Sequence, residues 1–231
     1  MKPVLLLVPG MLNDKRIWAQ VAAKLDDVAQ VRVAQVRTQS SLTDMAHDAW
    51  RLVDASAVDT PVLLAGFSMG GYVVMEMLSQ MAHPLHGVAF LSTSARPESP
   101  EGMAMRQKTI EAMQTDFPKV VEGILKWSTY RANEALTQEL RQMMLDLGSE
   151  VAIRQTRAIM ARRDHRAMLG RLTCPVRLLC GQWDRVTPPE LIQELSNLIP
   201  HALCQIVEDS GHMLPREQAD QVAHHLRQML A

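Results

Sequence analysis

The chain has 231 residues, of which 47% are hydrophobic and 21% charged, so it can bury one substantial core. Its formal net charge is -1 with both signs interspersed, so no basic surface for nucleic acid is expected. The apolar run after Lys2 and Pro3 is too short to span a membrane and lacks a signal-peptide cleavage pattern, so we expect a soluble, cytoplasmic protein without a membrane partner.

Short aliphatic runs recur along the chain, each bounded by Gly, Pro, Ser or Asp. Most are separated by a stretch with helical periodicity, an alternation typical of a parallel sheet covered by helices. The fold class is therefore expected to be α/β, with a doubly wound, mostly parallel sheet of about six strands. The predicted strands are residues 4–8, 31–36, 62–65, 88–91, 176–180 and 204–207.

Four apolar stripes at helical spacing predict helices that pack on this sheet. Ser41 and Asp44 are placed to cap the first turn of the earliest one. The second stripe follows Gly70 and Gly71 at once, so a strand is expected to turn almost directly into a helix. The stripes comprise Leu42, Met45, Ala46, Ala49, Trp50 and Val53; Val73, Val74, Met77, Leu78 and Met81; Leu191, Ile192, Leu195 and Leu198; and Val222, Leu226, Met229 and Leu230.

The segment from about residue 96 to residue 172 interrupts the alternation of strands and helices. It has helical periodicity and Met-rich apolar positions but no convincing strand. We interpret it as a helical cap of residues 96–172, inserted into a core made of residues 1–95 and 173–231.

Residues 66–70 read Gly-Phe-Ser-Met-Gly and fit the pattern G-x-S-x-G. The pattern lies where a nucleophilic serine on a sharp turn requires it, after one predicted strand and before an apolar helix. Small flanking residues avoid clashes in such a turn, which presents the serine hydroxyl above the edge of the sheet. Ser68 is therefore the candidate nucleophile.

A serine hydroxyl needs a neighbouring base to become a good nucleophile at neutral pH. His212 follows the last predicted strand through a short loop, at the sheet edge where parallel sheets build their sites. It is therefore the candidate general base. The other histidines considered lie in predicted helices or in the link between elements: His47, His83, His86, His224 and His225.

The imidazole in turn needs a carboxylate to hold its tautomer and to stabilise its cation. Asp184 directly follows the strand at residues 176–180 and is the leading candidate, with Asp209 as its rival. Asp146 and Asp164 lie in the helical segment, where solvated or helix-capping roles are expected.

An oxyanion formed at the reacting carbonyl would need two main-chain donors. The amide of Met69 lies at the start of the helix after Ser68 and is one candidate. The second is expected from the loop after the first strand, as the amide of Met11 or Leu12. The sequence has no HExxH and no other convincing ligand cluster, so no metal and no cofactor are expected.

These motifs in this order resemble the α/β-hydrolase superfamily over nearly the whole chain, and the general appearance is that of small bacterial esterase-like serine hydrolases. The resemblance rests on Pro9-Gly10, on residues 66–71, on Gly181-Gln182-Trp183-Asp184 with Thr187-Pro188, and on Ser210-Gly211-His212. It implies a triad of Ser68, Asp184 and His212 and a cap over the site. The chain differs in starting at what looks like the family's third strand, without the N-terminal hairpin, and in having Pro9-Gly10 where many members have His-Gly.

The function expected from these features is hydrolysis of carboxylic esters or thioesters of small, largely apolar substrates through an acyl-enzyme. The alternatives are a C–C bond hydrolase or lyase and a non-catalytic receptor for small ligands, because a fold alone does not decide function. A complete triad argues against the receptor. The candidates for lining a substrate pocket are Phe117, Trp127, Tyr130 and Met213, with core packing as the favoured alternative for the three aromatic residues at their helical spacing.

Overall fold

A computed structural model describes residues 2–54, 60–80 and 84–231, and Met81 and His83 lie outside these ranges. Its sheet has six strands in the order β2-β1-β3-β4-β5-β6, and all five pairings are parallel. The expected α/β fold class is thereby confirmed. The strands are β1 (Val4–Val8), β2 (Gln30–Val33), β3 (Val62–Phe67), β4 (Gly87–Leu91), β5 (Val176–Gly181) and β6 (Leu203–Val207).

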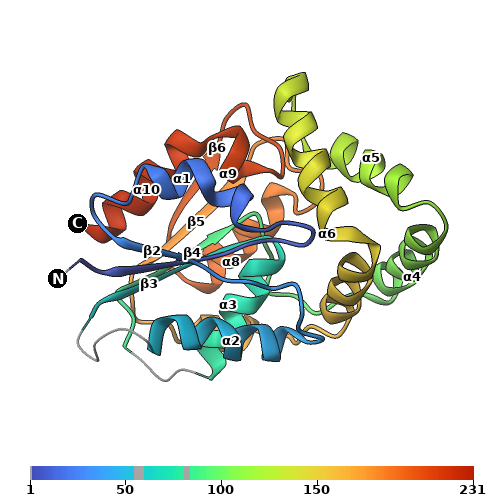
Figure 1. The fold of residues 1–231 in the computed structure, drawn as a ribbon. Coiled ribbons are helices and arrows are strands. Elements are labelled where there is room, and N and C mark those ends of the chain that lie inside the picture. Colours follow the sequence, from blue (N-terminus) through green and yellow to red (C-terminus); the bar gives the residue numbers. More distant parts are fainter. Residues whose placement is uncertain (1, 55–59, 81–83) are drawn as a thin grey trace.

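Helices cover both faces of the sheet (Figure 1). On one face, α2 (Leu42–Asp54), α3 (Met69–Ser79) and α8 (Pro189–Leu198) pack against one set of alternating strand residues. On the other, α1 (Ala19–Ala23) and α10 (Ala219–Leu230) pack against the opposite set. The short elements η1 (Lys15–Trp18) and α9 (Leu214–Glu217) complete the second layer. The central strands are therefore buried on both sides, as continuous apolar runs in parallel sheets require.

The four helical stripes correspond to α2, α3, α8 and α10. The expected cap of α2 is present, because the Ser41 hydroxyl accepts a 3.0 Å hydrogen bond from the amide of Asp44. The second strand is shorter than expected and ends at Val33, where its pairing with Leu7 of β1 ends. Beyond it the chain leaves the sheet, and Val36 joins the core beside α2.

Four helices lie between β4 and β5: α4 (Pro100–Thr115), α5 (Phe117–Ser128), α6 (Glu134–Met160) and α7 (Arg166–Leu169). No strand lies among the residues described between β4 and β5. In Figure 1, α4, α5 and α6 stand beyond the carboxyl ends of the strands, away from both termini. Gly148, with φ 81° and ψ 167°, interrupts α6 and divides it into two helical parts.

The chain passes from β1 outward to β2 and then returns to β3 on the other side of β1. Strand order therefore reverses at the β1–β3 pair, and the loops after these two strands diverge to opposite faces. Ligand sites in open parallel sheets form in the crevice that such a reversal opens at the carboxyl ends of the strands. The loop that contains Met11 and the turn that contains Ser68 both lie there.

Candidate active site

Ser68 occupies the turn between β3 and α3 in a backbone conformation that side chains rarely adopt, with φ 53° and ψ -118°. A side chain at Gly66 would collide with the carbonyl group of Gly70, and one at Gly70 would collide with that of Val8. The spacing of the glycines therefore follows from the tightness of the turn. The turn leaves the Ser68 side chain half-buried in a pocket.

His212 lies between Ser68 and Asp184. Its Nε2 is 2.9 Å from the Ser68 hydroxyl oxygen, and its Nδ1 is 2.9 Å and 3.0 Å from the two carboxylate oxygens of Asp184. Because the carboxylate can only accept, Nδ1 carries the proton and Nε2 is left to accept from the serine. The structure thus brings together the three residues that the sequence singled out, in a geometry suited to removing the serine proton.

The Asp184 carboxylate is held by its own loop after β5. Its Oδ1 accepts hydrogen bonds from the amides of Val186 (2.9 Å) and Thr187 (2.8 Å), and its Oδ2 accepts one from the Thr187 hydroxyl (2.9 Å). Burial acts to raise the pKa of Asp184, but the charge of His212 and the hydrogen bonds from His212 and Thr187 outweigh it and hold that pKa below its usual range. Asp184 is therefore ionised at neutral pH.

Asp209 does not occupy this position. It is exposed, and its φ of 49° turns the chain sharply just before Ser210 and His212. The other acids considered also lie elsewhere, since Asp146 pairs with Arg16 and Asp164 with Arg166, both at exposed positions. The direction that the chain takes after β6 keeps the Asp209 carboxylate away from the imidazole. The sequence alone does not predict that direction.

The two expected sources of oxyanion donors differ in how their amides are used. Met69 is the first residue of α3, where an amide has no acceptor inside the helix. Leu12, in contrast, donates its amide to the buried Oε1 of Gln155 at 2.8 Å. The Leu12 amide is therefore already hydrogen-bonded within the protein. Of the two loop candidates, Met11 is the one whose amide remains able to donate to a ligand.

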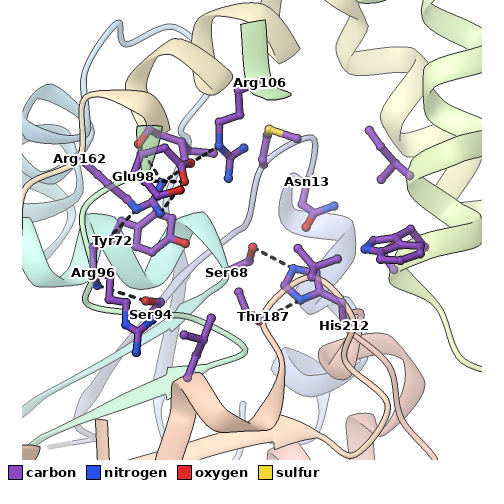
Figure 2. A pocket seen from close by; sticks show the side chains of 18 of the residues that line it. Asn13, Ser68, Tyr72, Ser94, Arg96, Glu98, Arg106, Arg162, Thr187 and His212 are labelled. Carbon is purple, nitrogen blue, oxygen red and sulfur yellow. Dashed lines mark hydrogen bonds and ion pairs between the residues drawn. The ribbon is translucent and has the colours of Figure 1, made fainter. Parts of the chain in front are cut away.

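A cavity of about 440 Å³ opens onto Ser68 and His212. It is bounded by the core loops on one side and by α4, α5 and α6 on the other, and Figure 2 shows most of its side chains. Its lining residues are Met11, Asn13, Ser68, Tyr72, Ser94, Arg96, Pro97, Glu98, Ser99, Arg106, Ile124, Trp127, Ser128, Ile159, Arg162, Val186, Thr187, Leu191, His212 and Met213.

Two of the four expected pocket residues line this cavity, Trp127 and Met213. The other two do not. Phe117 packs against the buried apolar cluster beneath the helices, and Tyr130 stacks on Trp183 with ring centroids 5.1 Å apart. Aromatic residues at helical spacing can face either the core or the cavity, and only the docking of α5 decides which.

Three polar residues that hold the loops of the site were assigned no role from the sequence: Thr187, Gln155 and Glu217. Glu217 accepts hydrogen bonds from the amides of Tyr130 (2.6 Å) and Gly211 (3.0 Å) and so joins the segment after α5 to the loop of His212. Burial raises the pKa of Glu217 to about 7, although these two hydrogen bonds act to lower it. No local motif marks Gln155 or Glu217, whereas Thr187-Pro188 lies within the segment after β5 that the sequence did indicate.

Within residues 2–54, 60–80 and 84–231, no group of three or more His, Cys, Asp or Glu side chains is arranged to hold a metal ion. The described helices include none that is long and apolar enough to cross a membrane.

A sequence profile described as the alpha/beta hydrolase family matches residues 5–225. Among curated proteins, a pimeloyl-[acyl-carrier protein] methyl ester esterase of Neisseria meningitidis is 24% identical over 166 residues, which cover 68% of this chain and 53% of that protein. The biotin biosynthesis bifunctional protein BioHC of Cellvibrio japonicus is 23% identical, over 96% of this chain and 46% of that protein. The chain thus matches only about half the length of these relatives.

Solved structures match the whole chain. A thermophilic esterase from Thermogutta terrifontis superimposes with a TM-score of 0.89 and 27% identity, covering 100% of this chain and 89% of that one. An esterase from Exiguobacterium antarcticum superimposes with a TM-score of 0.87 at 18% identity, covering 99% and 91%. The second likeness, at this low identity, bears on the fold alone.

Proposed function

Because the chain belongs to the alpha/beta hydrolase family, we propose that it is a serine hydrolase that cleaves carboxylic esters through an acyl-enzyme. The observation that carries the proposal is the contact of 2.9 Å between the Ser68 hydroxyl and Nε2 of His212, whose Nδ1 is held by Asp184. A nucleophile, a base and an orienting acid in hydrogen-bond contact are what acyl transfer to a serine requires.

In the proposed reaction, Ser68 Oγ attacks the ester carbonyl while His212 Nε2 takes its proton. The amides of Met69 and Met11 donate to the oxyanion that forms. Collapse of the tetrahedral intermediate breaks the ester C–O bond, and the imidazolium of His212 returns the proton to the departing alcohol. Water then attacks the acyl-enzyme by the same route, releasing the carboxylic acid and restoring Ser68.

We also propose that residues 96–172 act as a cap, with residues 1–95 and 173–231 as the catalytic core. The support is the composition of the cavity wall: Arg106 of α4, Trp127 of α5 and Ile159 of α6 face Ser68 and His212 across the cavity. The triad residues lie outside the cap. Cap residues would therefore select the substrate and leave the reaction type to the core.

The names of the relatives support an ester as substrate. The curated relatives include methyl ester esterases of an acyl group carried by a protein, and the Thermogutta terrifontis protein is an esterase. The volume of about 440 Å³ suits a small molecule.

The proposal is tested with p-nitrophenyl acetate and butyrate in the presence of EDTA, together with labelling by a fluorophosphonate. We expect turnover without added metal and labelling at Ser68 alone, and both should disappear in Ser68→Ala. Ser79→Ala, at the far end of the helix α3 that follows Ser68 and outside the cavity lining, is the matched control and should retain both. Activity that is lost with EDTA and returns with zinc, or labelling that survives in Ser68→Ala, would contradict the proposal.

A further inference from the structure

The cavity has an uneven distribution of charge. Its lining contains three arginines, Arg96, Arg106 and Arg162, and a single acid, Glu98. Arg96 is 54% exposed and pairs with Glu194 outside the lining, which leaves Arg106 and Arg162 to share Glu98. The pair and its acid carry one uncompensated positive charge at a largely buried position, where water screens it poorly.

Arg162 is fully used by the protein. Its side chain is 9% exposed, and its Nη1 and Nη2 contact Glu98 at 2.6 Å and 3.2 Å. The remaining donors reach main-chain carbonyl groups, namely those of Arg96, Pro97 and Ile159. Because no donor is left over, Arg162 holds Glu98 in place and has no capacity to bind a ligand.

Arg106 is only partly used. Its Nε donates to Glu98, whereas its Nη1 and Nη2 have no acceptor in the part of the chain that the structure describes. The side chain is 30% exposed and lines the cavity. A guanidinium fixed through Nε presents its two outer nitrogens as a planar fork, which matches the two oxygens of a carboxylate.

Tyr72 of α3 lines the same cavity as Arg106. The guanidinium of Arg162 stacks 4.9 Å above its ring centroid and fixes the ring. Burial raises the pKa of Tyr72, so the phenol keeps its proton and can donate a hydrogen bond. Among the described residues its hydroxyl has no hydrogen-bond partner, and Figure 2 shows this hydroxyl on the side of the ring that faces Ser68.

The reaction geometry sets which part of an ester reaches these groups. His212 must protonate the departing alcohol, so the alcohol lies on the His212 side of Ser68. In Figure 2, Ser68 stands between His212 on one side and Tyr72, Glu98 and Arg162 on the other. The acyl chain therefore extends from Ser68 toward Tyr72 and Arg106.

We propose that the acyl group of the substrate ends in a carboxylate, which binds the free nitrogens of Arg106 and the hydroxyl of Tyr72. The substrates would then be monoesters of linear dicarboxylic acids. This inference rests on the proposed esterase function and adds the substrate class. It assigns Arg106 and Tyr72 as specificity-determining residues, with Glu98 and Arg162 as their positioning residues.

The test uses matched substrates. Methanol release is measured from monomethyl esters of the dicarboxylic acids glutaric to suberic, and from the same methyl esters with the distant carboxylate replaced by a carboxamide. The carboxamide keeps the length and shape but removes the charge. With the wild-type protein we expect kcat/KM for the best half-ester to exceed that for its carboxamide by about 10- to 100-fold, because the ion pair between Arg106 and two carboxylate oxygens is replaced by a hydrogen bond to one neutral carbonyl oxygen.

Two variants locate the subsite. Arg106→Gln should remove the preference for the half-ester by lowering its kcat/KM to about that of the carboxamide ester, and labelling of Ser68 by the fluorophosphonate checks that the variant is folded. Tyr72→Phe removes only a hydroxyl that has no partner within the described ranges, and it should lower kcat/KM for the half-ester by about 3- to 10-fold, mainly through KM. Lys108→Gln removes a charge from an exposed position of the same helix and should change neither.

The outcomes separate the two proposals. If the wild-type protein hydrolyses the carboxamide ester as well as the half-ester, the carboxylate subsite is wrong and the esterase function stands. If the preference survives in both Arg106→Gln and Tyr72→Phe, the subsite has been placed at the wrong residues. If neither these methyl esters nor the p-nitrophenyl esters are hydrolysed, the proposed function itself fails.

Discussion

The main-chain amide of Leu12 donates a 2.8 Å hydrogen bond to Oε1 of Gln155, 143 residues further along the chain. The same fully buried side chain donates from Nε2 to the carbonyl oxygen of Val36, also at 2.8 Å. One residue of α6 therefore fixes both the loop after β1 and the segment after β2. Leu12 has a φ of 55°, a conformation that needs such support.

Gln155→Leu should impair catalysis more than substrate binding. The loop that it releases contains Met11, whose amide we propose as an oxyanion donor, and such a donor acts in the transition state. Complete loss of one donor costs ~10²–10³ in kcat, so a displaced donor should cost about 10-fold or more with little change in KM. Steady-state kinetics on p-nitrophenyl butyrate measure this. Gln142→Leu, at an exposed position of α6, is the control, and an effect on KM alone would contradict the assignment.

Asp184→Asn should lower kcat by up to ~10⁴, because the amide can no longer hold the imidazole tautomer or stabilise the imidazolium. Asp209→Asn should change kcat by less than about threefold, since that side chain is exposed and Asn tolerates the positive φ at this position. Both variants are compared as folded protein at one pH. A larger loss in Asp209→Asn than in Asp184→Asn would reverse the assignment of the acid.

Glu217 should make stability depend on pH. Its pKa is raised to about 7 in the folded protein, so between about pH 4.5 and pH 7 the folded state binds more protons than the unfolded state. The free energy of unfolding should therefore fall as pH rises through this window, by on the order of 3 kcal/mol from this group. Urea unfolding at pH 5, 6, 7 and 8 measures the slope.

In Glu217→Gln this contribution to the pH dependence should vanish, because an amide does not titrate. Glu208→Gln, at an exposed position before the same loop, should retain the wild-type slope. Equal slopes in the wild-type protein and Glu217→Gln would show that the carboxyl group of Glu217 titrates at its ordinary pKa.

Trp127→Ala should shift the preference for the size of the alcohol group, because the amide of His212 donates to the carbonyl oxygen of the adjacent Ser128 and the alcohol lies on the His212 side. Trp127 lines the cavity from α5, and its indole is held by a 3.2 Å hydrogen bond to the carbonyl oxygen of Arg185. Removing its apolar surface should lower kcat/KM for hexyl acetate about 3- to 10-fold relative to methyl acetate. Trp183→Ala is the matched control, because Trp183 is also exposed but does not line the cavity. The same shift in both variants would assign the effect to the stability of the cap.

The sequence by itself determined the features that depend on neighbouring residues. Buried strands are visible as aliphatic runs, and the turn at Ser68 is visible because only small residues fit at Gly66 and Gly70. Because parallel strands share one carboxyl edge, residues that follow different strands could be assigned to one site from their order alone. That reasoning anticipated the proximity of Ser68, Asp184 and His212.

Only the tertiary structure decided what depends on how the helices of residues 96–172 dock on the core. It distinguished Met11 from Leu12 as a source of the second oxyanion donor, because the Leu12 amide already donates a hydrogen bond to Gln155 of α6. It placed Trp127 at the cavity and Tyr130 against Trp183. Helical periodicity shows which face of a helix is apolar but not which neighbour that face contacts. The contact joins segments far apart in the chain and forms only when they pack.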